Sequence, residues 1–129
     1  MAIINGTAAS ETLPGTAAAD TITGAGGNDT ALMGGGNDVF VWNLDDGDDT
    51  VIGFDGNAAG GQDVLSLQTL FNSLSVSVVD RAGRVSIVDH GASVEIAVDT
   101  NGDLNFDLAV ATLKTADAIT IGQDIFVGT

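Results

Sequence analysis

An acidic residue recurs every nine positions near the start of the chain. The acids with this spacing are Glu11, Asp20, Asp29 and Asp38, and a fifth, Asp49, follows after a slip of two residues. Two positions beyond each acid the residue is apolar; these residues are Leu13, Ile22, Ala31, Phe40 and Val51. A short repeat with one acid and one inward apolar residue per unit predicts a solenoid of stacked strands that share one core.

Each nine-residue row divides into a turn and a strand. The five rows are GTAASETLP from Gly6, GTAAADTIT from Gly15, GAGGNDTAL from Gly24, MGGGNDVFV from Met33 and LDDGDDTVI from Leu44. Residues seven to nine of a row form a short strand whose eighth residue points inward. Residues one to six form a tight turn with positive φ angles, which glycine and asparagine adopt at little cost. If two rows complete one coil, turns eighteen residues apart stack at about the 4.8 Å spacing of neighbouring strands.

The acid at the sixth position of every row predicts a cation between stacked turns. Carboxylates held about 5 Å apart repel each other unless a cation lies between them. A gap lined by backbone carbonyls and one carboxylate from each turn suits calcium, since calcium accepts flexible oxygen coordination and magnesium needs a stricter octahedron. A metal-free solenoid, with Asn-Asp and Gly-Gly as ordinary turn formers, would explain the glycines but not the recurring acid. We therefore expect Ca²⁺ as the cofactor.

The charge balance fits a chain that folds when cations neutralise it. There are 18 acidic residues against 3 basic ones, a net charge of −15, and the 44% of hydrophobic residues argues against disorder. Only Arg81, Arg84 and Lys114 could meet a phosphate or sulfate, so we expect no nucleic acid, anionic membrane or polyanionic glycan as a partner. The chain has no cysteine, no apolar run long enough to span a membrane, and no Sec-type signal peptide at its start.

Two of the rows resemble a known family. GAGGNDTAL and MGGGNDVFV are similar to the RTX (repeats-in-toxin, hemolysin-type) nonapeptide G-G-x-G-x-D-x-U-x, which binds calcium. The resemblance implies an all-β fold with a short parallel β-roll in which turns eighteen residues apart share calcium. It pairs Asp20 with Asp38 and Asp29 with Asp49, and Glu11 with Asp29 as a further pair. The carbonyl ligands that it implies are those of Gly24, Gly26, Gly34 and Gly36.

From residue 53 onward the pattern changes to alternation typical of antiparallel strands. We predict strands at 75–79, 84–88, 93–98 and 104–113, and one more within 118–127. The chain then divides into a β-roll over residues 1–52 and an antiparallel C-terminal cap over residues 53–129.

Two segments of this second part also resemble known proteins. FDGNAAGGQDVLSL and VDTNGDLNFDLAV are similar to segments of serralysin-like C-terminal domains and type I secretion target domains. The resemblance implies a secreted bacterial protein, exported by an ABC transporter that reads an uncleaved C-terminal signal. The last residues, DIFVGT, are similar to the tail of such proteins.

A separate acidic loop lies late in the chain, at Asp99, Asn101, Asp103 and Asp107. Its D-x-N-x-D spacing matches the start of an EF-hand, but Gly102 comes one place early and the twelfth position is Val110 instead of glutamate. The loop is either an independent calcium site or an Asx-type turn between two strands, and we favour the turn.

Catalytic residue patterns are lacking in the sequence. The single histidine, His90, lies in the turn Asp-His-Gly and forms no recognisable triad, and one histidine without cysteine cannot make a zinc site. We therefore expect a non-enzymatic, calcium-binding RTX module that supports the secretion and stability of a secreted protein. A carbohydrate-binding or adhesive module is the alternative, for which Trp42 and a few phenylalanines are the only side chains that could stack on a neutral glycan.

Overall fold

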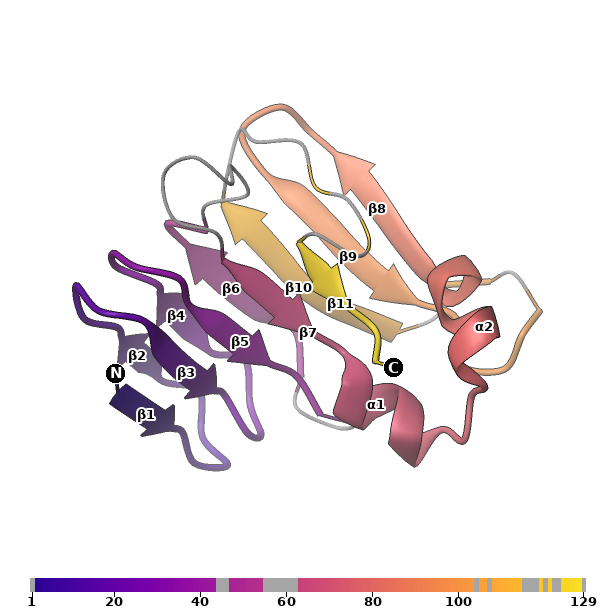
Figure 1. Cartoon of the computed structure of the whole chain (residues 1–129), viewed down its shortest axis with the longest axis horizontal. Helices are drawn as coiled ribbons and strands as arrows, with labels where there is room; N and C mark the ends of the chain where they lie inside the picture. Colours follow the sequence, from indigo (N-terminus) through magenta and orange to yellow (C-terminus); the bar gives the residue numbers. More distant parts are fainter. Residues whose placement is uncertain are drawn as a thin grey trace.

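The computed structural model describes residues 2–43, 47–54, 63–103, 105–106, 108–114, 119, 121 and 124–128. In this part of the chain all eleven strands belong to two sheets, drawn one in front of the other in Figure 1. The first sheet has the order β1 (Ala2–Asn5), β3 (Asp20–Thr23), β5 (Val39–Val41), β7 (Val64–Ser66) and β11 (Ile125–Phe126). The second has the order β2 (Thr12–Pro14), β4 (Thr30–Leu32), β6 (Asp49–Ile52), β10 (Leu108–Lys114), β9 (Val94–Val98) and β8 (Val85–Asp89).

The first seven strands form a parallel β-roll. Successive strands alternate between the two sheets, so two nine-residue rows complete one coil, as the repeat predicts. The eighth residues of the rows stack in register: Ile22 pairs with Phe40, and Phe40 with Leu65. All three side chains are fully buried, because they face the core between the sheets. The predicted all-β fold with a short β-roll is confirmed.

The antiparallel strands extend the roll sideways. β10 pairs in parallel with β6, the last strand of the roll in its sheet, and then β9 and β8 follow in antiparallel order. In the other sheet, β7 and β11 continue the parallel pairing beyond β5. One hydrophobic core therefore runs through both parts, from Leu13 in the roll to Val94 and Ile125. The predicted strands at 84–88, 93–98 and 104–113 correspond to β8, β9 and β10, with shifted ends.

The strand predicted over 75–79 is wrong. The segment lies between two short helices and runs into the second: α1 (Gln68–Ser73) ends before it, and α2 (Val78–Arg81) begins within it and is followed by a 3-10 turn (Ala82–Arg84). Leu67, Leu70 and Phe71 are fully buried, at the spacing of one helix face. Val76 is 8% exposed but Val78, two positions further on, is 40% exposed, so the alternation of SVSVV does not mark a face turned to the core. None of the described helices is long and apolar enough to cross a membrane.

Arg81 ties the helices to the C-terminal strand. It is only 6% exposed, and its guanidinium lies 5.8 Å from the ring centroid of Phe71. It donates hydrogen bonds to the carbonyl oxygens of Val76 (3.0 Å) and Val127 (2.7 Å) and to Oδ1 of Asn72 (2.9 Å). The guanidinium of Arg81 therefore binds backbone and amide oxygens inside the molecule, and Arg81 is not a surface cation.

Candidate metal centre

Three acids stack along the edge of the roll where β4 and β6 begin. The backbone N–H of Glu11 donates to Oδ1 of Asp29 (2.9 Å), and the N–H of Asp29 donates to Oδ1 of Asp49 (2.9 Å). Asp29 and Asp49 are 2% and 1% exposed, although each side chain is a carboxylate. The backbone of each turn thus satisfies one oxygen of the acid stacked beside it.

A second stack lies where β3, β5 and β7 begin. The N–H of Asp20 donates to Oδ1 of Asp38 (2.8 Å), and the N–H of Asp38 donates to Oδ1 of Asp63 (2.9 Å). All three acids are buried. The structure therefore brings together the two pairs that the RTX resemblance implies, Asp20 with Asp38 and Asp29 with Asp49, and extends the second stack to Asp63.

The second carboxylate oxygens in two of these turns lack a hydrogen-bond donor. Oδ2 of Asp29 and Oδ2 of Asp38 are buried and accept no hydrogen bond. A buried acceptor without a donor costs about 1–3 kcal/mol, and more when it is charged. Burial raises the pKa of Asp38, and the nearby charge of Asp20 raises it further, while the hydrogen bonds with the Asp20 backbone and the Asp63 side chain lower it.

The free oxygen of Asp29 faces the same point as an oxygen of Asp49. A methyl group added to Gly24 would lie 2.7 Å from Oδ2 of Asp29 and 3.3 Å from Oδ2 of Asp49. Glycine at this position thus leaves a space into which two carboxylates from stacked turns converge. A cation in that space would replace the missing donor and separate the two charges.

The donors in this region suit calcium and not zinc. No group of three or more His, Cys, Asp or Glu side chains that could hold a metal occurs among the described residues. A cation at the stacked turns would therefore bind two carboxylates and complete its shell with carbonyl oxygens, as calcium does. The carbonyls of Gly24, Gly26, Gly34 and Gly36 stay predicted ligands.

Asp20 differs from Asp29 and Asp38, because its own turn satisfies it. The N–H of Thr16 donates to Oδ2 of Asp20 (2.6 Å), and the Thr16 hydroxyl lies 2.9 Å from each carboxylate oxygen. The N–H of Thr7 donates in the same way to Oε1 of Glu11. A cation at either of these turns would have to displace those donors.

Two buried acids were missed in the repeat, Asp63 and Asp124. Asp63 is followed two positions later by buried Leu65, which is the acid-to-apolar spacing of every row. Asp124 is 1% exposed, and its carbonyl oxygen accepts the N–H of Leu65 (2.8 Å) beside β11. The sequence D-V-L at 63–65 has the acid and the apolar residue of a further row. The long segment after β6 separates it from the other rows and breaks the nine-residue period.

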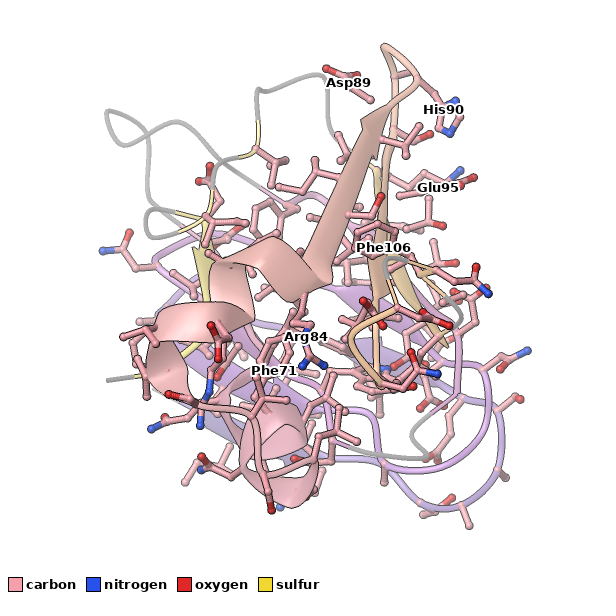
Figure 2. The ribbon with its side chains drawn as sticks, turned by 90° about the vertical axis from the view of Figure 1, so that its right-hand side faces the viewer. Phe71, Arg84, Asp89, His90, Glu95 and Phe106 are labelled. Carbon is pink, nitrogen blue, oxygen red and sulfur yellow. The ribbon has the colours of Figure 1, made fainter. Side chains whose placement is uncertain are left out.

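The late acidic loop has the hydrogen bonds of a turn. Oδ1 of Asp99 accepts the N–H groups of Asn101 (3.2 Å) and Gly102 (2.9 Å), which is an Asx-type arrangement. Oδ1 of Asp103 accepts the N–H of Asn105 (2.9 Å). The guanidinium of Arg84, labelled in Figure 2, donates to the carbonyl of Asp99 (3.3 Å). A positive side chain therefore already lies against this loop, whereas Asp107 lies outside the described residues.

Two other candidate residues have ordinary structural surroundings. Trp42 is fully buried and donates its Nε1 proton to the carbonyl of Gly47 (3.1 Å), so it offers no surface for stacking on a sugar. His90 and Glu95 lie 3.4 Å apart on the β8–β9 hairpin, far from the helices in Figure 2, and both side chains are exposed. In the part of the chain that the structure describes, His90 thus makes an exposed contact with Glu95 at the end of the hairpin.

The fold places this chain among all-β proteins with a parallel β-roll. No family model matches the sequence, and no curated protein matches it. Among solved structures, it is similar to the solution structure of the AlgE6R3 subunit from the Azotobacter vinelandii mannuronan C5-epimerase. The identity is 22% over 84% of this chain and 72% of that chain, and the TM-score of 0.30 makes the likeness a coarse one.

Proposed function

We propose that the chain is a calcium-binding β-roll module whose fold is stabilised by calcium held between stacked turns. The observation that carries this proposal is the pair of buried carboxylate oxygens, Oδ2 of Asp29 and Oδ2 of Asp38, that accept no hydrogen bond. Left without a cation, each would be a charged, desolvated atom with no compensating partner, which proteins rarely retain.

Two groups of residues would hold the ions. Asp29 and Asp49 would bind one calcium in the space beside Gly24, where their second oxygens converge. Asp38 and Asp63, joined by a backbone hydrogen bond of 2.9 Å, would bind another in the second stack. Calcium would supply the positive charge that the carboxylates lack. Carbonyl oxygens of the turns would complete its coordination, while the backbone N–H groups keep the carboxylates in position.

The wider role follows from the resemblance of the sequence to RTX and type I secretion target domains. We expect the module to be non-enzymatic and extracellular, and to fold on the calcium it meets outside the cell. Export by an ABC transporter that reads the C-terminal residues is part of the same proposal. A glycan ligand stays an alternative prediction; Trp42 is fully buried, whereas Phe106 is 37% exposed.

The test is a calcium titration of the purified chain followed by far-UV circular dichroism and thermal melting. Binding to the native state alone stabilises it by about 2.7 kcal/mol per site at a hundredfold excess over Kd. We expect the melting temperature to be far higher in millimolar calcium than in EGTA, with magnesium unable to replace calcium. A melting temperature that is the same in calcium and EGTA would refute the proposal.

A further inference from the structure

The turns of the roll fall into two classes by backbone conformation. In the turn Gly24–Asp29, φ is positive at Ala25 (65°) and Gly27 (89°). In the turn that ends at Asp38, φ is positive at Gly34 (75°) and Gly36 (90°), the same second and fourth positions. The two earlier turns, at 6–11 and 15–20, contain no residue with positive φ.

The hydrogen bonding of the acid at position six divides the turns into the same two classes. In the two early turns, the N–H of the second residue, Thr7 or Thr16, donates to the acid at position six. In the two later turns, Oδ2 of Asp29 and of Asp38 accepts no hydrogen bond. The sign of φ at position two therefore coincides with whether the second carboxylate oxygen has a protein donor.

In the early turns, too, oxygen atoms line the space beside the first glycine of the turn. A methyl group added to Gly15 would lie 2.5 Å from the carbonyl oxygen of Met33, which belongs to the stacked turn. The turn of Gly15 itself presents both oxygens of Asp20, which are bound to the N–H and the hydroxyl of Thr16. What distinguishes it from the space beside Gly24 is the N–H and O–H that already point at the acid.

We propose that the second residue of each turn decides whether that turn holds a cation. A residue in the left-handed conformation, such as Ala25 or Gly34, leaves the carboxylate oxygen open to a metal. A threonine with negative φ, such as Thr7 or Thr16, supplies an N–H donor in its place and makes the turn metal-free. This inference rests on the proposed calcium-binding function and assigns its ions to the later turns of the roll.

The left-handed conformation has a cost that supports a functional role. Ala25 is one of two described non-glycine residues with positive φ, and such a conformation costs an alanine about 1–2 kcal/mol. Strain of this kind persists where the surrounding structure or a ligand compensates for it. Threonine, which is β-branched, is poorly suited to that conformation, so the early turns keep the negative φ.

The test converts an early turn into a late one. The variant Thr16→Gly/Ala18→Gly/Ala19→Asn gives the turn at 15–20 a glycine at positions two and four and an asparagine at position five, as in the turn that ends at Asp38. Isothermal titration calorimetry should show one more calcium bound per chain than in the wild type. Thr16→Ser and Ala17→Gly, which leave the donor and the φ pattern in place, should show no gain.

The reverse variant covers the case in which the triple variant does not fold. Ala25→Thr restores at position two the residue of the early turns, and it should lose one bound calcium while circular dichroism in excess calcium remains native. An unchanged calcium number in a folded triple variant, or in a folded Ala25→Thr, would overturn the inference. A wild-type chain that binds no calcium at all would instead refute the proposed function.

Discussion

Replacing Asp29 by asparagine should have opposite effects on stability with and without calcium. Oδ2 of Asp29 is buried, accepts no hydrogen bond and faces the same point beside Gly24 as Oδ2 of Asp49. In EGTA, the amide of Asp29→Asn removes one of the two converging charges and can donate to Asp49. The oxygen that accepts the N–H of Glu11 at 2.9 Å is retained.

The magnitude follows from the cost of an unsatisfied buried acceptor. Relieving it should raise the free energy of unfolding in EGTA by about 1–3 kcal/mol. In calcium at a hundredfold excess over Kd, the variant should lose most of the roughly 2.7 kcal/mol that one site contributes. With about 4 °C of melting temperature per kcal/mol in a domain of this size, the calcium-induced shift should shrink by roughly 10–20 °C, because both effects reduce it.

The assay is thermal melting of wild type and variant in EGTA and in millimolar calcium. Asp80→Asn is the matched control, because it removes the same charge from an exposed carboxylate in α2 and should keep the full calcium-induced shift. If Asp29→Asn lowers the melting temperature equally in EGTA and in calcium, Asp29 is a structural residue and not a ligand. If Asp80→Asn matches Asp29→Asn, the acids act only as bulk charge.

Three further predictions follow from single contacts. Ala25→Gly should raise the free energy of unfolding by about 1 kcal/mol in calcium, because glycine adopts positive φ without the cost that alanine bears; an urea melt that shows no gain would contradict the assigned conformation. Asp63→Asn should reduce the calcium-induced melting shift as much as Asp38→Asn does, and a shift equal to that of the wild type would remove Asp63 from the site. Arg81→Ala should cost about 2–4 kcal/mol in urea unfolding, because it leaves the carbonyl oxygens of buried Val76 and half-buried Val127 without the donor that Arg81 supplies; exposed Lys114→Ala should cost less than about 0.5 kcal/mol by the same assay, and equal costs would refute the role of Arg81 in joining the helices to the C-terminal strand.

The roll itself could be predicted from the sequence because its determinants are local and periodic. The spacing of nine predicts the strands and the inward residues such as Ile22 and Phe40, and the RTX resemblance implies the pairs of stacked acids. Each of these requires only the repeat and the geometry of a coil with two strands per turn.

The features that were missed depend on contacts between distant parts of the chain. The parallel pairing of β10 with β6 joins segments that share no repeat, and no local pattern encodes it. Residues 75–79 are predicted as a strand because S-V-S-V-V alternates, but α2 begins at Val78 within this segment and Val78 is 40% exposed. Arg81 looks like a surface cation until the chain brings Val76 and Val127 to its guanidinium.

Only part of the candidate metal site can be predicted from the sequence, because the rest depends on contacts that the repeat does not specify. The repeat identifies which acids stack, but it does not show that Thr16 satisfies Asp20 whereas Asp29 keeps an open oxygen. That difference depends on the sign of φ at one residue of each turn, which the chemistry of the side chain only biases. Asp63 is not among the predicted ligands, because a long segment separates it from the regular rows.

The central claim is that calcium lies between stacked turns, and locating the ions tests it most directly. Crystals grown with calcium and measured at a wavelength where calcium scatters anomalously should show a peak beside Gly24, bound by Asp29 and Asp49, and a second between Asp38 and Asp63. The turns at 6–11 and 15–20 should show none. Peaks only at exposed carboxylates such as Asp80 or Asp89, with the space beside Gly24 empty in a well-ordered roll, would contradict the account.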